Sequence, residues 1–206
     1  VVGGFVNGYQ NMDKKTWSWS PNALGASNGV WTQLRDMPGP FQGNTHCGNT
    51  ADHENEIMYI FGGLAMPTGT TGFSNAFSTS RFLAFDVNGA ADGLGTWTVL
   101  ASAPVAIGAA GAAFLDGKVH VVKGTTEVGD NDIFFDSGEP IKKDNLNHYI
   151  YDVASDTWST AGTTRTSGNH VSMGIIGKKL VVAGGQLLRF EACNNLADVE
   201  VYDTEN

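Results

Sequence analysis

Ile60-Phe61-Gly62-Gly63 is an apolar strand that ends in a pair of glycines, and the chain contains four copies of this arrangement. The other copies are Val1-Val2-Gly3-Gly4, Val121-Val122-Lys123-Gly124 and Val182-Ala183-Gly184-Gly185. Their last glycines, at positions 4, 63, 124 and 185, lie 59, 61 and 61 residues apart, and tryptophans follow the first three copies at positions 31, 97 and 158. A period near 60 with both markers indicates one four-stranded unit per repeat, stacked radially.

An aromatic residue followed by aspartate marks a later apolar strand in three repeats. The pairs are Phe85-Asp86, Tyr151-Asp152 and Tyr202-Asp203. Two repeats depart from the pattern, since Trp19-Ser20 takes this place in the first and Lys123 replaces a glycine in the third. Together these motifs resemble the Kelch repeat over nearly the whole chain. The resemblance implies an all-β fold, a segment of a Kelch-type β-propeller built from four-stranded antiparallel blades.

The residues point to the same fold without the resemblance. Short runs rich in Val, Ile, Phe, Tyr and Thr are bounded by Gly, Asn, Asp and Pro, as in strands. No window shows the 3.6-residue period of an amphipathic helix, so we expect almost no helix. Glycine weakens a strand, and a repeated pair therefore predicts a bulge or a close approach of two backbones.

The repeats divide the single segment 1–206 into blades. We expect partial blade 1 at 1–42, blade 2 at 43–103, blade 3 at 104–164 and partial blade 4 at 165–206. Each terminal blade lacks one strand, and an isolated arc exposes apolar faces that soluble monomers avoid. We therefore expect a larger propeller of six or seven blades, with the remaining blades from the rest of the chain or from another chain. A closed four-bladed ring is the alternative.

Composition narrows the choice of partner and compartment. Charged residues make up 16% of the chain, the net charge is −9, and lysine and arginine form no cluster. This argues against nucleic acid as a partner, and no apolar run is long enough to span a membrane. Much Gly, Ser, Thr and Asn favours an extracellular protein, without fixing the compartment. Cys47 and Cys193 are expected to be free thiols, although Cys193 could pair with another chain.

Some members of the Kelch superfamily are enzymes, so we compare this chain with the residues that their catalytic sites need. Cys47 stands where galactose oxidase-like copper enzymes carry a cysteine that is joined to a tyrosine of the next blade. The matching position here is Gly108, and no tyrosine lies near it, so the radical cofactor cannot form. His46 and His170, on inner strands of blades 2 and 4, are interpreted as structural, and His120 as a core or interface histidine. We expect no cofactor and favour a non-catalytic protein.

The second and third strands of each blade are expected to be joined by long loops, at 5–15, 64–79, 125–146 and 186–196. Long loops in a compact fold are usually functional or disordered. The loops carry aromatic residues that no strand requires, and these are the candidate binding residues: Tyr9, Phe73, Phe77, Phe134 and Phe135. Asp130, Asp132 and Asp136 offer oxygen ligands for Ca²⁺, but they lack the glycine and terminal glutamate of an EF-hand, and solvated charge is favoured.

These observations favour a binding or scaffold module that recognises a protein or a glycan through its loop face. Two alternatives stay open. The first is part of a Kelch-type enzyme, an oxidase or sugar epimerase, whose catalytic residues lie outside this segment. The second is a structural component of an extracellular assembly.

Overall fold

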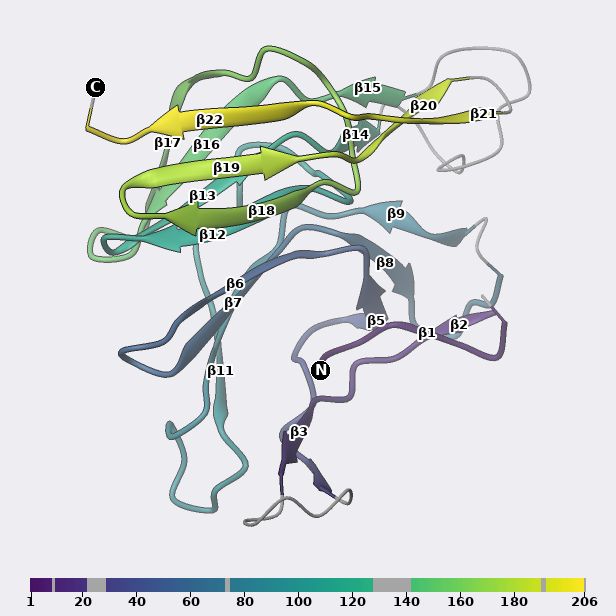
Figure 1. Ribbon diagram of the computed structural model, residues 1–206. Coiled ribbons are helices and arrows are strands. Elements are labelled where there is room, and N and C mark those ends of the chain that lie inside the picture. Colours follow the sequence, from purple (N-terminus) through teal and green to yellow (C-terminus); the bar gives the residue numbers. More distant parts are fainter. Residues whose placement is uncertain (9, 22–28, 73–74, 128–141, 190–191, 206) are drawn as a thin grey trace.

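The computed structural model describes residues 1–8, 10–21, 29–72, 75–127, 142–189 and 192–205. Strands make up 52% of the structure and the described residues contain no helix, which confirms the prediction of an all-β chain. The strands form small antiparallel sheets that succeed one another along the chain, and none of the described sheets is closed (Figure 1).

Each repeat contributes one of these sheets, which we number 1 to 4 in chain order. Sheet 1 pairs β3 (Trp17–Ser20) with β4 (Val30–Gln33). Sheet 2 has the order β6 (Gly48–Asp52), β7 (Ile57–Phe61), β10 (Phe82–Asp86), β11 (Thr96–Val99). Sheet 3 has the order β12 (Gly111–Leu115), β13 (Lys118–Val122), β16 (Asn147–Asp152), β17 (Thr157–Thr163). Sheet 4 has the order β18 (Ser172–Ile176), β19 (Lys179–Ala183), β22 (Val199–Asp203).

The expected order of four strands is thus present in sheets 2 and 3, and three of the four strands are present in sheet 4. In the first repeat the expected strand at Val1-Val2 is reduced to a single bridge between Val2 and Thr16. The repeat boundaries after residues 42, 103 and 164 stay predictions.

The largest core cluster lies between sheets 2 and 3. Phe61 and Phe82 are paired on β7 and β10, so both point from sheet 2 toward Tyr151 and Trp158 of sheet 3. The Phe82 ring centroid lies 4.6 Å from that of Tyr151 and 5.2 Å from that of Trp158, both in edge-to-face geometry. Burial of each such side chain contributes roughly 1.5–3 kcal/mol, and each aromatic pair about 0.5–1.5 kcal/mol more. These aromatic contacts hold the two sheets together.

The glycine motifs of the second and third repeats link their sheets to the next. Gly62 and Gly63 have φ angles of +57° and +87°, in the left-handed region that glycine tolerates best. The Gly63 N–H donates to the Ile107 carbonyl at 2.8 Å, and a Cβ on Gly62 would lie 2.2 Å from the same oxygen. In the next repeat the Gly124 N–H donates to the Gly168 carbonyl at 2.7 Å. The pairs therefore mark the close backbone approach that the sequence predicts.

The segments predicted as long loops contain strands. After each glycine motif the chain enters a second small sheet. These sheets are β1 (Phe5–Val6) with β2 (Asn11–Met12), β8 (Leu64–Pro67) with β9 (Phe77–Ser78) and the earlier β5 (Phe41–Thr45), β14 (Thr125–Glu127) with β15 (Lys142–Asp144), and β20 (Gln186–Arg189) with β21 (Ala192–Asn195). Leu64 and Met66 of β8 are buried with Met12 and Ala76, so apolar burial holds these strands in place. Figure 1 shows the small sheets along one side of the molecule, on the right in that view, and we call this side the hairpin end.

Candidate functional site

Three equivalent residues form a line across sheets 2, 3 and 4. His46, Ala109 and His170 each lie two residues before the first strand of their sheet, and their φ angles are +50°, +54° and +53°. The Ala109 N–H donates to the His46 carbonyl and the His170 N–H donates to the Ala109 carbonyl, each at 2.8 Å. The backbone thus sets the same position of three successive repeats side by side.

The small side chain of Ala109 lets the two histidines meet. The ring centroids of His46 and His170 lie 5.1 Å apart, with the ring planes perpendicular. The Phe5 ring of β1 adds an edge contact to His46 at 5.7 Å. The Nδ1 atom of His170 lies 2.6 Å from Oδ1 of Asn169 and 2.9 Å from Nε2 of Gln186. We call Phe5, His46, Asn169, His170 and Gln186 the histidine site.

The histidine site is polar and carries no charge at neutral pH. Burial, and secondly the neighbouring His170, lowers the pKa of His46, and burial lowers the pKa of His170. Asn169 is fully buried, and its Nδ2 atom has no hydrogen-bond partner among the described residues. Buried amide groups are normally paired, so this one has capacity for a further acceptor. Neutral imidazoles and amides beside an aromatic ring can exchange hydrogen bonds with hydroxyl groups.

The sequence placed His46 and His170 on separate blades as structural residues, but the structure brings them into contact. Asn169, Gln186 and Phe5 were missed altogether. The repeat period is the sequence signal that could have found this contact. His46, Ala109 and His170 are 63 and 61 residues apart, so they hold the same position in three successive repeats. Within the described part of the chain, no three His, Cys, Asp or Glu side chains gather as a metal ion would need.

Of the predicted binding residues, the described structure contains Phe77. It lies on β9 at the hairpin end, half-buried, with its ring edge-to-face against Phe41 at 5.1 Å. The Arg81 guanidinium lies over the Phe41 ring, 5.3 Å from its centroid. The remaining predicted residues fall outside the described residues: Tyr9, Phe73, Phe134, Phe135, and the Ca²⁺ candidates Asp130, Asp132 and Asp136.

Cys47, next to His46, is a free thiol. Burial raises its pKa to about 12, although the positive charge of Arg81 acts in the opposite direction. The thiolate is the reactive form of cysteine, and the raised pKa disfavours that form in Cys47 at neutral pH. Cys193 lies on β21, and its side chain is outside the described part of the structure.

We therefore expect Cys47 to resist alkylation. In a Cys193→Ser variant, iodoacetamide at mildly alkaline pH should leave the folded protein unmodified by mass spectrometry. The same protein unfolded in guanidinium should react fully, which serves as the control. Rapid modification of the folded variant would show that the thiol is accessible and ionised.

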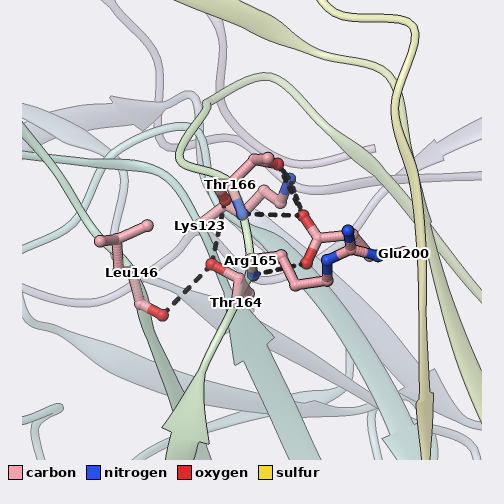
Figure 2. A network of polar contacts seen from close by, with 6 residues as sticks. All are labelled: Lys123, Leu146, Thr164, Arg165, Thr166 and Glu200. Carbon is pink, nitrogen blue, oxygen red and sulfur yellow. Dashed lines mark hydrogen bonds and ion pairs between the residues drawn. The ribbon is translucent and has the colours of Figure 1, made fainter.

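A second polar group, between sheets 3 and 4, is satisfied internally (Figure 2). Lys123 is buried, and its Nζ atom lies 2.7 Å from Oε1 of Glu200 and donates to Oγ1 of Thr166 at 2.9 Å. Glu200 also accepts hydrogen bonds from the Arg165 N–H and the Thr166 hydroxyl, each at 2.7 Å. Burial opposes ionisation of Glu200, but these donors together lower its pKa to about 2. Both oxygens of the carboxylate have partners within the fold, so we interpret this ion pair as structural.

A third polar pair, His120 with His148, also lies between sheets 3 and 4. The Nδ1 atom of His120 lies 3.0 Å from Nε2 of His148, and the His148 ring packs edge-to-face on Tyr202 of sheet 4 at 4.6 Å. Both histidines are buried, and burial lowers the pKa of each to about 4. His120 is thus an interface histidine, one of the two roles expected from the sequence.

Comparison with known proteins adds a fold likeness. No protein-family model matches the chain, and no curated protein is similar to it in sequence. A solved structure of YjhT is similar with a TM-score of 0.63 and 16% sequence identity, over 92% of this chain and 59% of that one. The chain therefore spans 59% of the length of the YjhT chain, and the likeness concerns the fold alone. The described residues include no helix with the length and apolar character of a membrane span.

Proposed function

We propose that sheets 1 to 4 are successive blades of a Kelch-type β-propeller arc. Three observations support this arrangement. Two sheets have the expected order of four strands, the glycine motifs of the second and third repeats bond to the repeat that follows, and residues at the same position of three repeats lie in line. The similarity to YjhT over 92% of the chain agrees with a fold shared by a longer protein.

On this framework we propose that the chain is a binding module whose hairpin end recognises a glycan or a protein. The observation that carries the proposal is the histidine site, where neutral imidazoles, two amides and an aromatic ring meet at the base of the small sheets. The backbones of Asn169 and Gln186 exchange two hydrogen bonds at 2.8 and 2.9 Å, so β20 starts directly beside the site. Uncharged donors and acceptors with aromatic surface match the hydroxyl-rich faces of a sugar, and this favours a glycan.

An enzyme is the second candidate, and one observation favours it. His46 and His170 are in contact, and neutral histidine is the side chain best suited to proton transfer near neutral pH. In that case this chain would supply two groups to an oxidase or epimerase whose other catalytic residues lie outside the segment.

Ligand binding can be tested with His170→Ala on an array of neutral and acidic glycans, followed by calorimetry with any glycan that binds. Loss of a hydrogen bond worth about 1–1.4 kcal/mol predicts about five- to tenfold weaker binding. His53→Ala is the matched control, because His53 is exposed in the turn between β6 and β7, away from the small sheets. Equal affinities for the two variants would contradict a role for the histidine site.

A second variant in the same binding experiment tests the predicted aromatic residues. A variant with Ala at Phe73, Phe77, Phe134 and Phe135 should keep the circular dichroism of the wild type and bind its partner more weakly. Binding of a protein rather than a glycan would appear as a pull-down that this variant loses. Unchanged affinity for either partner would exclude these aromatic residues from the binding surface.

A further inference from the structure

Two amide side chains distinguish the fourth repeat from the two repeats before it. Asn169 and Gln186 are partners in a backbone bridge that lies beside His170. The same backbone pairing recurs in the third and second repeats, as Gly108 with Thr125 and Thr45 with Leu64. Neither of those pairs carries an amide side chain, so the backbone pairing does not require the amides of Asn169 and Gln186.

Both amides lie against the same ring nitrogen of His170. Its Nδ1 atom is 2.6 Å from Oδ1 of Asn169 and 2.9 Å from Nε2 of Gln186. A neutral imidazole carries a proton on one ring nitrogen and a lone pair on the other. Nδ1 therefore either donates to the Asn169 oxygen or accepts from the Gln186 amide, but it does not do both at once. The choice fixes whether the other nitrogen, Nε2, is an acceptor or a donor.

The contact with Asn169 decides which tautomer is present. Its 2.6 Å is shorter than the usual N–H···O distance of about 2.9 Å, and two lone pairs would repel each other at that distance. Turning the Asn169 amide would instead place two nitrogens there, and nitrogen is larger than oxygen. Nδ1 therefore carries the proton and donates to Oδ1 of Asn169. Gln186 is only half-buried, so its amide can turn to present its oxygen to the same N–H.

We propose that Asn169 is a positioning residue, which holds His170 as the Nδ1–H tautomer so that the Nε2 lone pair accepts a hydrogen bond from a hydroxyl group of the ligand. His170 is exposed, and within the described part of the chain no hydrogen bond reaches its Nε2 atom. An acceptor at this place selects a donor, so a hydroxyl group fits opposite Nε2, whereas an ionised carboxylate, which only accepts, does not. The inference takes its ligand from the proposed function, whereas the tautomer follows from the contacts alone.

Nitrogen-15 NMR of the histidine rings tests the tautomer without any ligand. Long-range proton–nitrogen spectra at mildly alkaline pH distinguish a protonated ring nitrogen from one with a lone pair, and His170→Ala identifies the His170 signals. In the wild type the Nδ1–H form should exceed the Nε2–H form at least about fivefold, as one ordinary hydrogen bond gives. Asn169→Ala should lose this excess. Asn169→Asp, which keeps an oxygen acceptor, should retain it.

Gln186→Leu is the matched control, because Leu64 holds the same position in the second repeat. It should keep the proton on Nδ1, since Asn169 alone accepts from that atom. Circular dichroism checks that each variant folds. An Nε2–H form that predominates in the wild type would overturn the proposal, even if Asn169→Ala does not fold. An unchanged ratio of tautomers in folded Asn169→Ala would overturn it as well.

The ligand hydroxyl is tested with a glycan that binds on the array and with its deoxy analogues, each lacking one hydroxyl group. One analogue should bind the wild type about five- to tenfold more weakly than the parent glycan, and His170→Ala should not distinguish the two. If His170→Ala discriminates every analogue as the wild type does, Nε2 accepts nothing from the ligand and the proposal is wrong. An Nδ1–H form in a protein that binds no glycan would support the role of Asn169 and reject the proposed function, so the two failures are distinguishable.

Discussion

Acidification below pH 6.5 is expected to destabilise this protein steeply, because His120 and His148 are held neutral between sheets 3 and 4. Their pKa values fall from the ordinary 6.5 to about 4 on folding. The unfolded chain therefore takes up protons first as the pH falls. The stability is complete above pH 6.5 and decreases progressively toward pH 4.

The expected loss is about 2–3 kcal/mol for each histidine, where the lower value allows for partial screening by solvent. Total stabilities are typically about 5–15 kcal/mol, so the effect is large. Burial is the main cause, and the nearby charges of Lys118 and Asp116 act on His120 in opposite directions. Denaturant unfolding at several pH values measures the loss directly.

The matched control is His120→Val/His148→Phe, which takes its residues from the neighbouring repeats. Val181 holds the register position of His120 in sheet 4, and Phe82 holds that of His148 in sheet 2. The double change nearly conserves side-chain volume, so the core should tolerate it. The variant should lose less stability than the wild type between pH 6.5 and 4, because only His46 and His170, whose pKa values are also lowered by burial, still oppose acidification. If the variant is as acid-sensitive as the wild type, groups other than His120 and His148 cause the loss of stability.

Lys123→Met is expected to lower the free energy of unfolding by about 3–5 kcal/mol, because it leaves the Glu200 carboxylate buried without its cation. The side chain of Lys123 is 2% exposed and that of Glu200 14%, so water cannot replace the lost partner fully. Lys123→Met/Glu200→Leu removes both charges and should recover most of the loss. Urea unfolding of the wild type, both single variants and the double variant gives the coupling energy.

The pH dependence separates this ion pair from the histidines. The pKa of Glu200 is lowered from 4.5 to about 2, so the pair stabilises the fold above pH 4.5 and is lost as the pH falls toward 2. The loss of stability in that window should therefore be larger in the histidine double variant than in Lys123→Met/Glu200→Leu, where only other carboxylates with lowered pKa values, such as Asp52 and Asp156, remain. A single variant that is as stable as the wild type would show that the pair contributes little.

The repeat predicted most of the strands because its sequence markers lie close together in the chain. Each copy carries its own apolar strand, glycine pair and aromatic residue, so the all-β fold and the positions of the main strands follow from residues close together in the chain. The strands after the glycine pairs were missed because segments such as 64–67 and 125–127 are too short to show a period of their own. Their burial against residues from other segments, such as Met12 on Leu64, decides that they pair.

The polar contacts could not be predicted for a different reason. Lys123 was visible as a departure from the glycine pair, but its partner Glu200 lies in the next repeat and has no motif of its own. The contact of His46 with His170 likewise depends on the intervening Ala109, which the sequence presents as one alanine among several. A repeat fixes which positions are equivalent, whereas the side chain at each position decides what those positions do.

At His46, Ala109 and His170 the backbone holds the repeats together, and the side chains provide the chemistry. Main-chain atoms alone form the bonds that join the three positions, and a histidine at two of them shows that a full side chain tolerates the left-handed backbone. Substitution at these positions therefore leaves the inter-repeat bonds in place. Divergence of this chain could therefore replace these side chains one at a time while the architecture beneath them stays the same.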